Sequence, residues 1–357
     1  MRIVRSISLT LALLLVAVAS AAAEMPSIRG GDLTTQSASS GLDATFLTLV
    51  ERQTEPAWVG YEVPSLPGHR MYCGDSERRD CLCRLESNHE SYSQTSSSDS
   101  DETREPGVMF VLFRVNNHRI ERIRTCSSYC RLDAGGLPFF WLTDVRPSES
   151  VALLESIPDR LGTLAKHAKG MTDEAITAIA FHGDPAAAAA LERLVRPEEP
   201  VEVREHAIFW VGENGGPHGV EILRRVLHDD PDHEVREGAV FALSCSSSPA
   251  ALDLLMQTAR EDKDPQIRSN ALFWLANKAG DKAAAAIAGA AADDPDADVK
   301  EQAIFALSQL PSERGVPLLI EAARTNRSPK VREQAIFWLG QSDDPRALEF
   351  FEEVLTR

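Results

Sequence analysis

The cysteines are the first residues in this sequence whose type and spacing could do chemistry. Five of the six precede residue 131, and they are Cys73, Cys81, Cys83, Cys126 and Cys130. In an exported protein such a group forms disulfides, and the odd number predicts two bridges and one spare thiol. The alternative is a zinc site in which Cys73, Cys81 and Cys83 act with His69 or His89. Disulfides are favoured because the N-terminus predicts export.

Histidines and carboxylates gather in one further segment, His228-Asp-Asp-Pro-Asp-His233. This segment matches no zinc motif, and acidic residues are common at the start of helices. The chain has no serine-hydrolase, zinc-protease, phosphate-loop or dinucleotide motif. The glycine-rich segment Asp133-Ala-Gly-Gly136 is typical of a turn rather than of a catalytic carboxylate. The sequence therefore predicts no catalytic residue, no cofactor and no metal.

The first 23 residues have the features of a secretory signal peptide. Arg2 and Arg5 precede an apolar run over residues 7–18, and small residues follow. Because the run is too short to span a bilayer, we expect cleavage before Glu24 rather than an uncleaved anchor. No later segment is apolar for long enough to cross a membrane. The mature chain is therefore expected to be periplasmic in a bacterium, or secreted, with no membrane span.

Acidic residues outnumber basic ones. The net charge is −17, and loss of Arg2 and Arg5 with the signal peptide makes it −19. From Met171 onward the chain has 33 Asp and Glu and 19 Lys and Arg, a net charge of −14. Because such a surface repels phosphate backbones, we expect no nucleic-acid partner and favour basic protein partners over acidic ones.

Residues 24–170 divide into a leader and an irregular module. The leader, 24–41, is polar and rich in Gly and Ser, which predicts a flexible segment. The module, 42–170, predicts a small α+β fold. Within it, residues 87–106 are too polar to form a core, which predicts a disordered loop.

Hydrophobic patterns predict the elements of the module. The runs around Asn116-Asn117 indicate a hairpin, because asparagine tolerates the positive φ angles of tight turns. The predicted helices span 42–52, 148–157 and 159–169, and the predicted strands span 57–63, 108–115 and 118–124.

Residues 171–357 repeat with a period of 32 residues. The pattern Val-Arg-Glu-x-Ala-Ile-Phe-Trp begins at Val203 and recurs with changes at 235, 267, 299 and 331, after a degenerate copy at Met171. In each copy the apolar residues share one side of a first helix, and a second amphipathic helix follows a short turn. Neither helix can bury its apolar side alone, so stacked helix pairs are predicted.

Two features identify the type of repeat. Most first helices follow a proline, and in four repeats an acidic residue lies six positions before a basic one. Tetratricopeptide and ankyrin signatures are absent from the sequence. The pattern resembles HEAT repeats over residues 171–357, in particular the short type named after phycobilisome-lyase-like proteins. The predicted fold class is mainly α: a C-terminal α-solenoid of HEAT-like helix pairs with a small N-terminal α+β module.

The resemblance also implies a structural ladder of charged residues between neighbouring repeats. Its pairs would be Glu198 and Arg204, Asp230 and Arg236, Asp262 and Arg268, Asp294 and Lys300, and Asn326 and Arg332. HEAT proteins are mostly interaction scaffolds, and the bilin lyases are a minority.

One column of the repeat lies outside the predicted core. Counted from Val299, Phe305 lies at about 240° around the first helix, whereas the apolar side is centred near about 60°. The column consists of Phe209, Phe241, Phe273, Phe305 and Phe337. These side chains either pack between adjacent first helices or form a partly exposed row that binds a protein. The neighbouring Trp210, Trp274 and Trp338 alternate with alanine, which favours packing in the core.

These patterns together predict an exported, non-enzymatic protein-interaction scaffold. The alternative is an enzyme or enzyme regulator whose site lies in residues 42–170, with the solenoid docking a substrate or partner. The two hypotheses differ in whether Asp133, His118 and Cys130 converge on a polar pocket.

Overall fold

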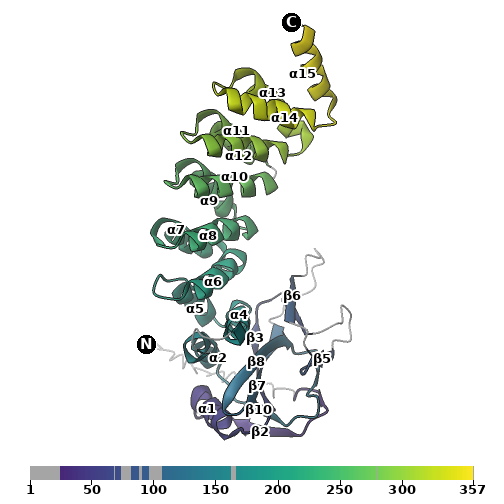
Figure 1. The fold of residues 1–357 in the computed structure, drawn as a ribbon. Helices are drawn as coiled ribbons and strands as arrows, with labels where there is room; N and C mark the ends of the chain where they lie inside the picture. Colours follow the sequence, from purple (N-terminus) through teal and green to yellow (C-terminus); the bar gives the residue numbers. More distant parts are fainter. Residues whose placement is uncertain are drawn as a thin grey trace, which may run out of the picture.

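The computed structural model describes residues 25–67, 69–73, 82–87, 91–95, 107–161, 166–278 and 280–356. A β-rich module lies at one end, and an array of helix pairs extends away from it (Figure 1). The predicted signal peptide, 1–23, lies outside the described residues. Within the described residues, none of the helices is long and apolar enough to span a membrane.

A five-stranded sheet forms the centre of the module. Its strand order is β2 (Leu33–Ser37), β10 (Phe139–Thr143), β3 (Ala57–Ser65), β7 (Gly107–Asn116) and β8 (Arg119–Ser127). Strands β3, β7 and β8 are antiparallel, and β10 runs parallel to both β2 and β3. The predicted hairpin is confirmed, since Asn117 and His118 between β7 and β8 have φ angles of 46° and 62°.

Both faces of this sheet are covered, which explains the unbroken apolar run in β7. Met109, Val111 and Phe113 point into a core shared with the helices, while Phe110 and Leu112 point into a second core on the opposite face. On the first face α1 (Leu42–Arg52) brings the Phe46 ring to 4.6 Å from the Phe113 ring. The predicted helix at 42–52 is confirmed.

The leader is not a flexible segment, because it contributes two strands to sheets of the module. In the leader, β1 (Ile28–Arg29) pairs with β9 (Arg131–Asp133), which also pairs with β5 (Leu82–Arg84), and β2 joins the central sheet. The prediction of a flexible leader was wrong because backbone pairing needs no apolar side chains, and all five residues of β2 are exposed.

The predicted disordered loop, 87–106, also contains a strand. Within it, β6 (Ser91–Thr95) pairs with β4 (His69–Cys73), so the loop prediction was wrong for these five residues. The rest of that prediction, at 88–90 and 96–106, lies outside the described residues.

Six helix pairs form the described array, and each pair contributes one helix to each of two layers. The A layer contains α4 (Lys166–Ala180), α6 (Val201–Asn214), α8 (His233–Cys245), α10 (Pro265–Asn277), α12 (Ala297–Ser308) and α14 (Pro329–Gly340). The B layer contains α5 (Ala186–Leu194), α7 (Gly216–Asp229), α9 (Pro249–Glu261), α11 (Asp281–Asp293), α13 (Ser312–Thr325) and α15 (Pro345–Thr356). In Figure 1 the A layer lies on the right of the array, on the side toward which the β-rich module projects.

Side-chain caps fix where the A-layer helices begin. Asp232, Asp264, Asp296 and Ser328 accept hydrogen bonds from the first free backbone N–H groups of α8, α10, α12 and α14. The acidic residues in the turns between repeats therefore cap helices, as the sequence analysis expected for acidic residues at helix starts.

The module and the array share one hydrophobic core, whose buried residues extend from Ala38 to Phe350. At the junction the Gly183 N–H donates to Pro64 O at 2.7 Å and the Leu66 N–H donates to Phe181 O at 2.9 Å. Helices α2 (Pro147–Glu155) and α3 (Ile157–Leu161) connect the sheet to α4. The predicted boundary at residue 170 falls inside α4, because that helix packs against both β8 and α6.

Candidate protein-interaction surface

Buried arginine–aspartate pairs connect neighbouring repeats. Arg204 pairs with Asp230, and Arg268 donates from Nε and Nη2 to the two carboxylate oxygens of Asp294 at 2.9 Å each. All four side chains are buried, so each charge depends on its partner. The hydrogen bond to Asp294, opposed by burial, raises the pKa of Arg268.

The ladder therefore differs from the pairs expected from the sequence. Each side-chain partner lies 26 positions later, in the following repeat, rather than six positions earlier. The residue six positions earlier contributes its backbone carbonyl instead, as in Arg236 to Asp230 O (3.0 Å), Arg268 to Asp262 O (2.8 Å) and Arg332 to Asn326 O (2.8 Å). Glu198 is exposed and Lys300 is half-buried.

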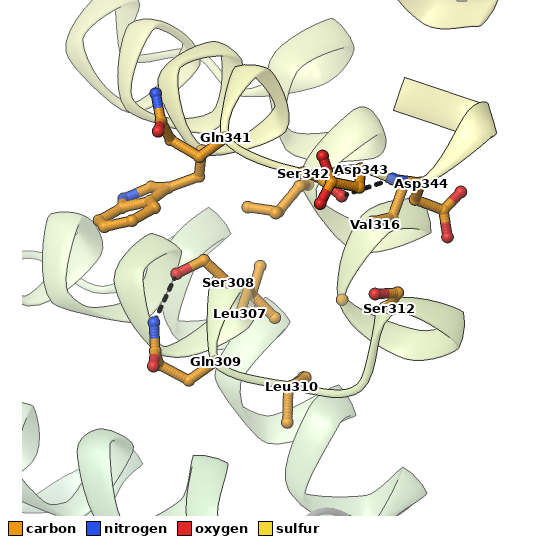
Figure 2. A pocket seen from close by; sticks show the side chains of 13 residues that line it. Leu307, Ser308, Gln309, Leu310, Ser312, Val316, Gln341, Ser342, Asp343 and Asp344 are labelled. Atoms are coloured by element: carbon orange, nitrogen blue, oxygen red, sulfur yellow. Dashed lines mark hydrogen bonds between the residues drawn. The ribbon is translucent and has the colours of Figure 1, made fainter. Parts of the chain in front are cut away.

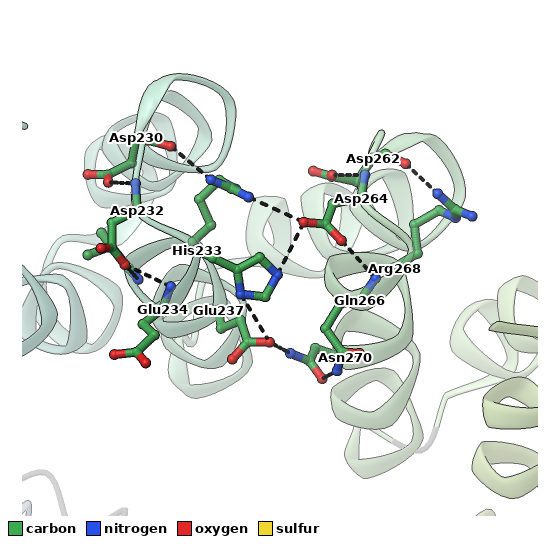
Figure 3. Close-up of polar contacts among 12 residues, drawn as sticks. Asp230, Asp232, His233, Glu234, Glu237, Asp262, Asp264, Gln266, Arg268 and Asn270 are labelled. Carbon is green, nitrogen blue, oxygen red and sulfur yellow. Dashed lines mark hydrogen bonds and ion pairs between the residues drawn. The ribbon is translucent and has the colours of Figure 1, made fainter. Parts of the chain in front are cut away.

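In the third repeat the ladder arginine, Arg236, has a side-chain partner at a different position. Arg236 Nη2 lies 3.3 Å from Asp264 Oδ2, and His233 Nε2 lies 3.1 Å from the same oxygen (Figure 3). Burial opposes ionisation of Asp264, but the Gln266 N–H and the charges of His233 and Arg236 prevail and lower its pKa. Of the two histidines in the segment 228–233, His233 thus reaches the next repeat, while the exposed His228 contacts Asp229. Among the described residues, no group of three or more metal-binding side chains is assembled.

Aromatic side chains form a row along the A layer, which we call the aromatic stripe. Rings of neighbouring repeats touch: Phe209 stacks on Phe241 at 6.0 Å between centroids, and Phe241 lies 4.8 Å from Trp274. A third contact between neighbouring repeats joins Phe305 to Trp338, at 5.4 Å. The stripe consists of Phe209, Trp210, Phe241, Phe273, Trp274, Phe305, Phe337 and Trp338.

The phenylalanines of the stripe are both packed and exposed. Phe241, Phe273 and Phe337 expose 36%, 37% and 55% of their surface, whereas Phe209 and Phe305 are half-buried. Phe209, Phe241 and Phe305 contact a ring of the next repeat, whereas the printed ring contacts of Phe273 and Phe337 are with the tryptophan beside them on the same helix. The alternative of packing between adjacent first helices therefore describes Phe209, Phe241 and Phe305, and binding of a protein by the exposed rings stays a prediction.

The tryptophans extend further into the helix packing. Trp210 is 9% exposed and lies 4.9 Å from the Phe181 ring, while Trp274 and Trp338 are half-buried. Phe181 was not among the candidates, because it lies in the degenerate first repeat and outside the phenylalanine column. The alanines that alternate with tryptophan, Ala242 and Ala306, are fully buried.

A pocket of about 490 Å³ lies at the C-terminal end of the stripe (Figure 2). Trp338 forms one wall, Leu307, Leu310 and Leu319 supply apolar surface, and the charged lining residues are Asp343 and Asp344. The pocket thus places carboxylates beside an aromatic ring that belongs to the stripe.

The module residues that would favour an enzyme lie apart. His118 precedes β8 and donates from Nδ1 to Glu51 O, whereas Cys130 follows the other end of that strand. A nine-residue strand is about 30 Å long, so these side chains do not converge. Asp133 accepts a hydrogen bond from Gly135 N at 3.0 Å, and Gly135 and Gly136 have positive φ angles, which is the predicted turn.

The cysteines of the module differ in state. Cys83 and Cys130 take part in disulfide bonds, whereas Cys126 is a buried free thiol whose pKa burial raises to about 12. The side chains of Cys73 and Cys81 lie outside the described residues, so the connectivity stays a prediction, whereas the zinc site that would include Cys83 is contradicted by the disulfide of that residue.

Comparison with known proteins identifies the repeat. The sequence pattern of the HEAT-repeat family matches residues 195–276, 252–336 and 284–357. Residues 195–357 are HEAT repeats. No curated protein has a sequence that matches this chain.

Solved structures similar to these HEAT repeats include enzymes and transport receptors. Human deoxyhypusine hydroxylase is 21% identical, with 57% of this chain and 81% of that chain covered and a TM-score of 0.26. The CpcE–CpcF complex of phycocyanin lyase from Nostoc is 20% identical, with 55% and 77% covered and a TM-score of 0.30. Kap95p bound to RanGDP is 16% identical, with 55% and 30% covered and a TM-score of 0.36. At these identities the likeness concerns the repeat fold alone.

Proposed function

We propose that this protein is an exported, non-enzymatic scaffold that binds a partner protein through the aromatic stripe of its HEAT repeats. The observation that carries the proposal is the partial exposure of Phe241, Phe273 and Phe337 in one row. HEAT repeats suggest a protein-interaction solenoid, and the stripe gives that solenoid a specific surface.

The exposed rings contribute more to binding than to folding. A water-exposed phenylalanine gains little for folding, whereas the same ring buried by a partner contributes about 25 cal/mol per Å² of apolar surface. Aligned aromatic residues are also the side chains that dominate binding energy at protein interfaces. A phosphate backbone would instead be repelled by the excess of carboxylates in this array.

Export is part of the proposal and is supported by sequence features. The first 23 residues read as a signal peptide, and the cysteine content of the module suits an oxidising compartment. Cell fractionation followed by N-terminal sequencing tests this part. The proposal expects a mature N-terminus at Glu24 in the periplasm or medium, and a full-length chain retained in the cytoplasm would contradict it.

The binding part is tested with Phe241→Ser combined with Phe273→Ser. We expect each substitution to lower the free energy of unfolding by about 1–2 kcal/mol, because roughly a third of each ring is already exposed. We expect capture of the native partner from extract to be lost. Leu348→Ser is the matched control, since Leu348 is 62% exposed on α15, outside the stripe. Retained capture by the double variant would refute the assignment of the stripe.

A further inference from the structure

We propose that the aromatic stripe binds an extended, arginine- or lysine-rich segment of the partner, with one cationic side chain at each repeat. This inference rests on the proposed function and names the chemistry of the partner. It follows from the charges that flank the rings, from the spacing of the repeats, and from the pocket at the end of the stripe.

Carboxylates accompany the phenylalanines along the A layer. The residue four positions before each phenylalanine lies on the same helix face, next to the ring. Four of these five positions are glutamates: Glu205, Glu237, Glu301 and Glu333, with Ser269 at the fifth. One turn further toward the N-terminus lie Glu202, Glu234 and Asp298, all of them exposed.

Part of this negative charge has no counter-charge. Lys330 pairs with Glu301, and Asn270 donates to Glu237 at 2.8 Å. Within the described part of the chain, however, Glu205 and Glu333 make no ion pair. Burial together with the charges of Glu234 and its neighbours raises the pKa of Glu205, despite Lys169, so carboxylates repel one another here. A cation brought to this surface relieves that repulsion.

An aromatic ring beside a carboxylate selects a cation with an apolar stem. The ring face attracts an ammonium or guanidinium group, the carboxylate pairs with it, and the ring covers the methylene groups of the side chain. An acidic or purely apolar segment satisfies only part of such a surface. Arginine and lysine satisfy all of it.

The spacing of the repeats favours an extended segment. Packed helices lie about 8–10 Å apart, so the A-layer helices and the carboxylates on them repeat at about that distance, although the rings of Phe209 and Phe241 approach each other to 6.0 Å. A polyproline II segment rises about 3.1 Å per residue with three residues per turn, so every third side chain lies on one face at about 9 Å intervals. A cation at every third position therefore meets one ring and one carboxylate group per repeat.

The pocket beside Trp338 extends the same chemistry to the end of the stripe. Its charged lining residues, Asp343 and Asp344, are both carboxylates (Figure 2). Asp344 is already paired with Arg346 at 2.7 Å. Asp343 is exposed. The last cationic side chain of the bound segment thus has a pocket with an indole wall and an acidic rim.

The direct test uses synthetic peptides and the full mature chain. The test peptide repeats Arg-Pro-Ala five times. Three others have Gln in place of Arg, the same arginines clustered at one end, or arginine every seventh residue in a helix-forming background. Binding is measured by calorimetry and by tryptophan fluorescence at two salt concentrations.

We expect the period-three peptide to bind at least about tenfold more tightly than the glutamine and clustered peptides, with affinity falling as salt rises. If the clustered peptide bound with equal affinity, the proposed spacing of one cation per repeat would be overturned. If the helical peptide bound more tightly, the proposed extended conformation would be overturned. Binding that is unaffected when Gln replaces Arg would overturn the cationic partner itself.

Matched variants assign the binding to the flanking carboxylates. Glu205→Gln combined with Glu234→Gln should lower the affinity for the period-three peptide by about three- to tenfold. The melting temperature of the protein should stay unchanged or rise, because the mutual repulsion of the two carboxylates is removed. Asp253→Asn is the control, because Asp253 is an exposed carboxylate on α9 of the B layer. An equal loss in both variants would overturn the assignment to this face.

The outcome separates this inference from the proposed function. If no arginine peptide binds but the Phe241 and Phe273 substitutions still abolish capture of the native partner, the stripe is a protein-binding surface for a non-basic partner. If both fail, the stripe itself is not the binding surface.

Discussion

Arg268 and Asp294 form a two-point ion pair between successive helix pairs, with both nitrogen–oxygen distances at 2.9 Å and both side chains buried. The pair joins α10 to the turn before α12, so it fixes the position of one repeat on the next. A solenoid gains stability from such nearest-neighbour contacts rather than from contacts between distant residues.

Removal of one partner from this pair should weaken the array strongly. We expect Arg268→Ala to lower the free energy of unfolding by about 3–5 kcal/mol, because Asp294 is left buried and unpaired. Arg332→Ala is the matched comparison, since Arg332 donates to the backbone carbonyls of Asn326 and Arg327. Arg332→Ala should lower the free energy of unfolding by about 1 kcal/mol. Urea unfolding of both variants checks this, and equal losses would contradict the role of the ion pair.

Helices α6 and α8 approach each other closely at Gly212 and Ala242. A methyl group at Gly212 would lie 2.4 Å from the carbonyl oxygen of Ala242, so α6 and α8 touch at backbone distance. Gly212→Ala should therefore destabilise the protein by about 1–3 kcal/mol. Gly238→Ala on α8 meets no atom within 4 Å and should stabilise by about 0.5–1 kcal/mol. Thermal unfolding of the two variants measures the difference, and shifts of the same sign would argue against the contact.

The junction between module and array should lose stability in acid through His182. Burial, opposed by Asp184, lowers the pKa of this 2% exposed histidine from 6.5 to about 4. Because the folded protein favours the neutral ring, the stabilisation is complete above pH 6.5 and is lost as the pH falls toward 4. The loss is at most about 3 kcal/mol.

The measurement is urea unfolding at pH 7, 5.5 and 4 for the natural chain and for His182→Asn. Asparagine does not titrate and retains an acceptor for the Asp184 N–H, which His182 Nδ1 accepts at 3.1 Å. We expect a flatter pH dependence in the variant. Parallel curves would show that another group controls the acid limb.

Features set by local spacing could be predicted from the sequence, and features set by pairing between distant segments could not. The helix pairs and the hairpin at Asn117 follow from hydrophobic periodicity and turn chemistry, which act over a few residues. Strand β2 was missed because its partner β10 lies about a hundred residues later and its own side chains are all exposed.

The same distinction applies to the candidate site. The phenylalanine column was visible from its angle on the helix, and the carboxylates that flank it are also in the sequence. The partner of Arg268 was misassigned, because six residues along the chain and 26 residues along the chain are equally plausible until the helices are stacked. The pocket beside Trp338 involves two turns from different repeats and has no local signal.

Site-specific photo-crosslinking in the native compartment tests the central claim most directly. A benzophenone amino acid at position 273 replaces a ring of the stripe that is 37% exposed, and the same probe at position 253 on the B layer is the control. The account predicts a discrete crosslinked partner from position 273 and none from position 253. Crosslinking from position 253 alone, or from neither position while the partner is still captured, would contradict it.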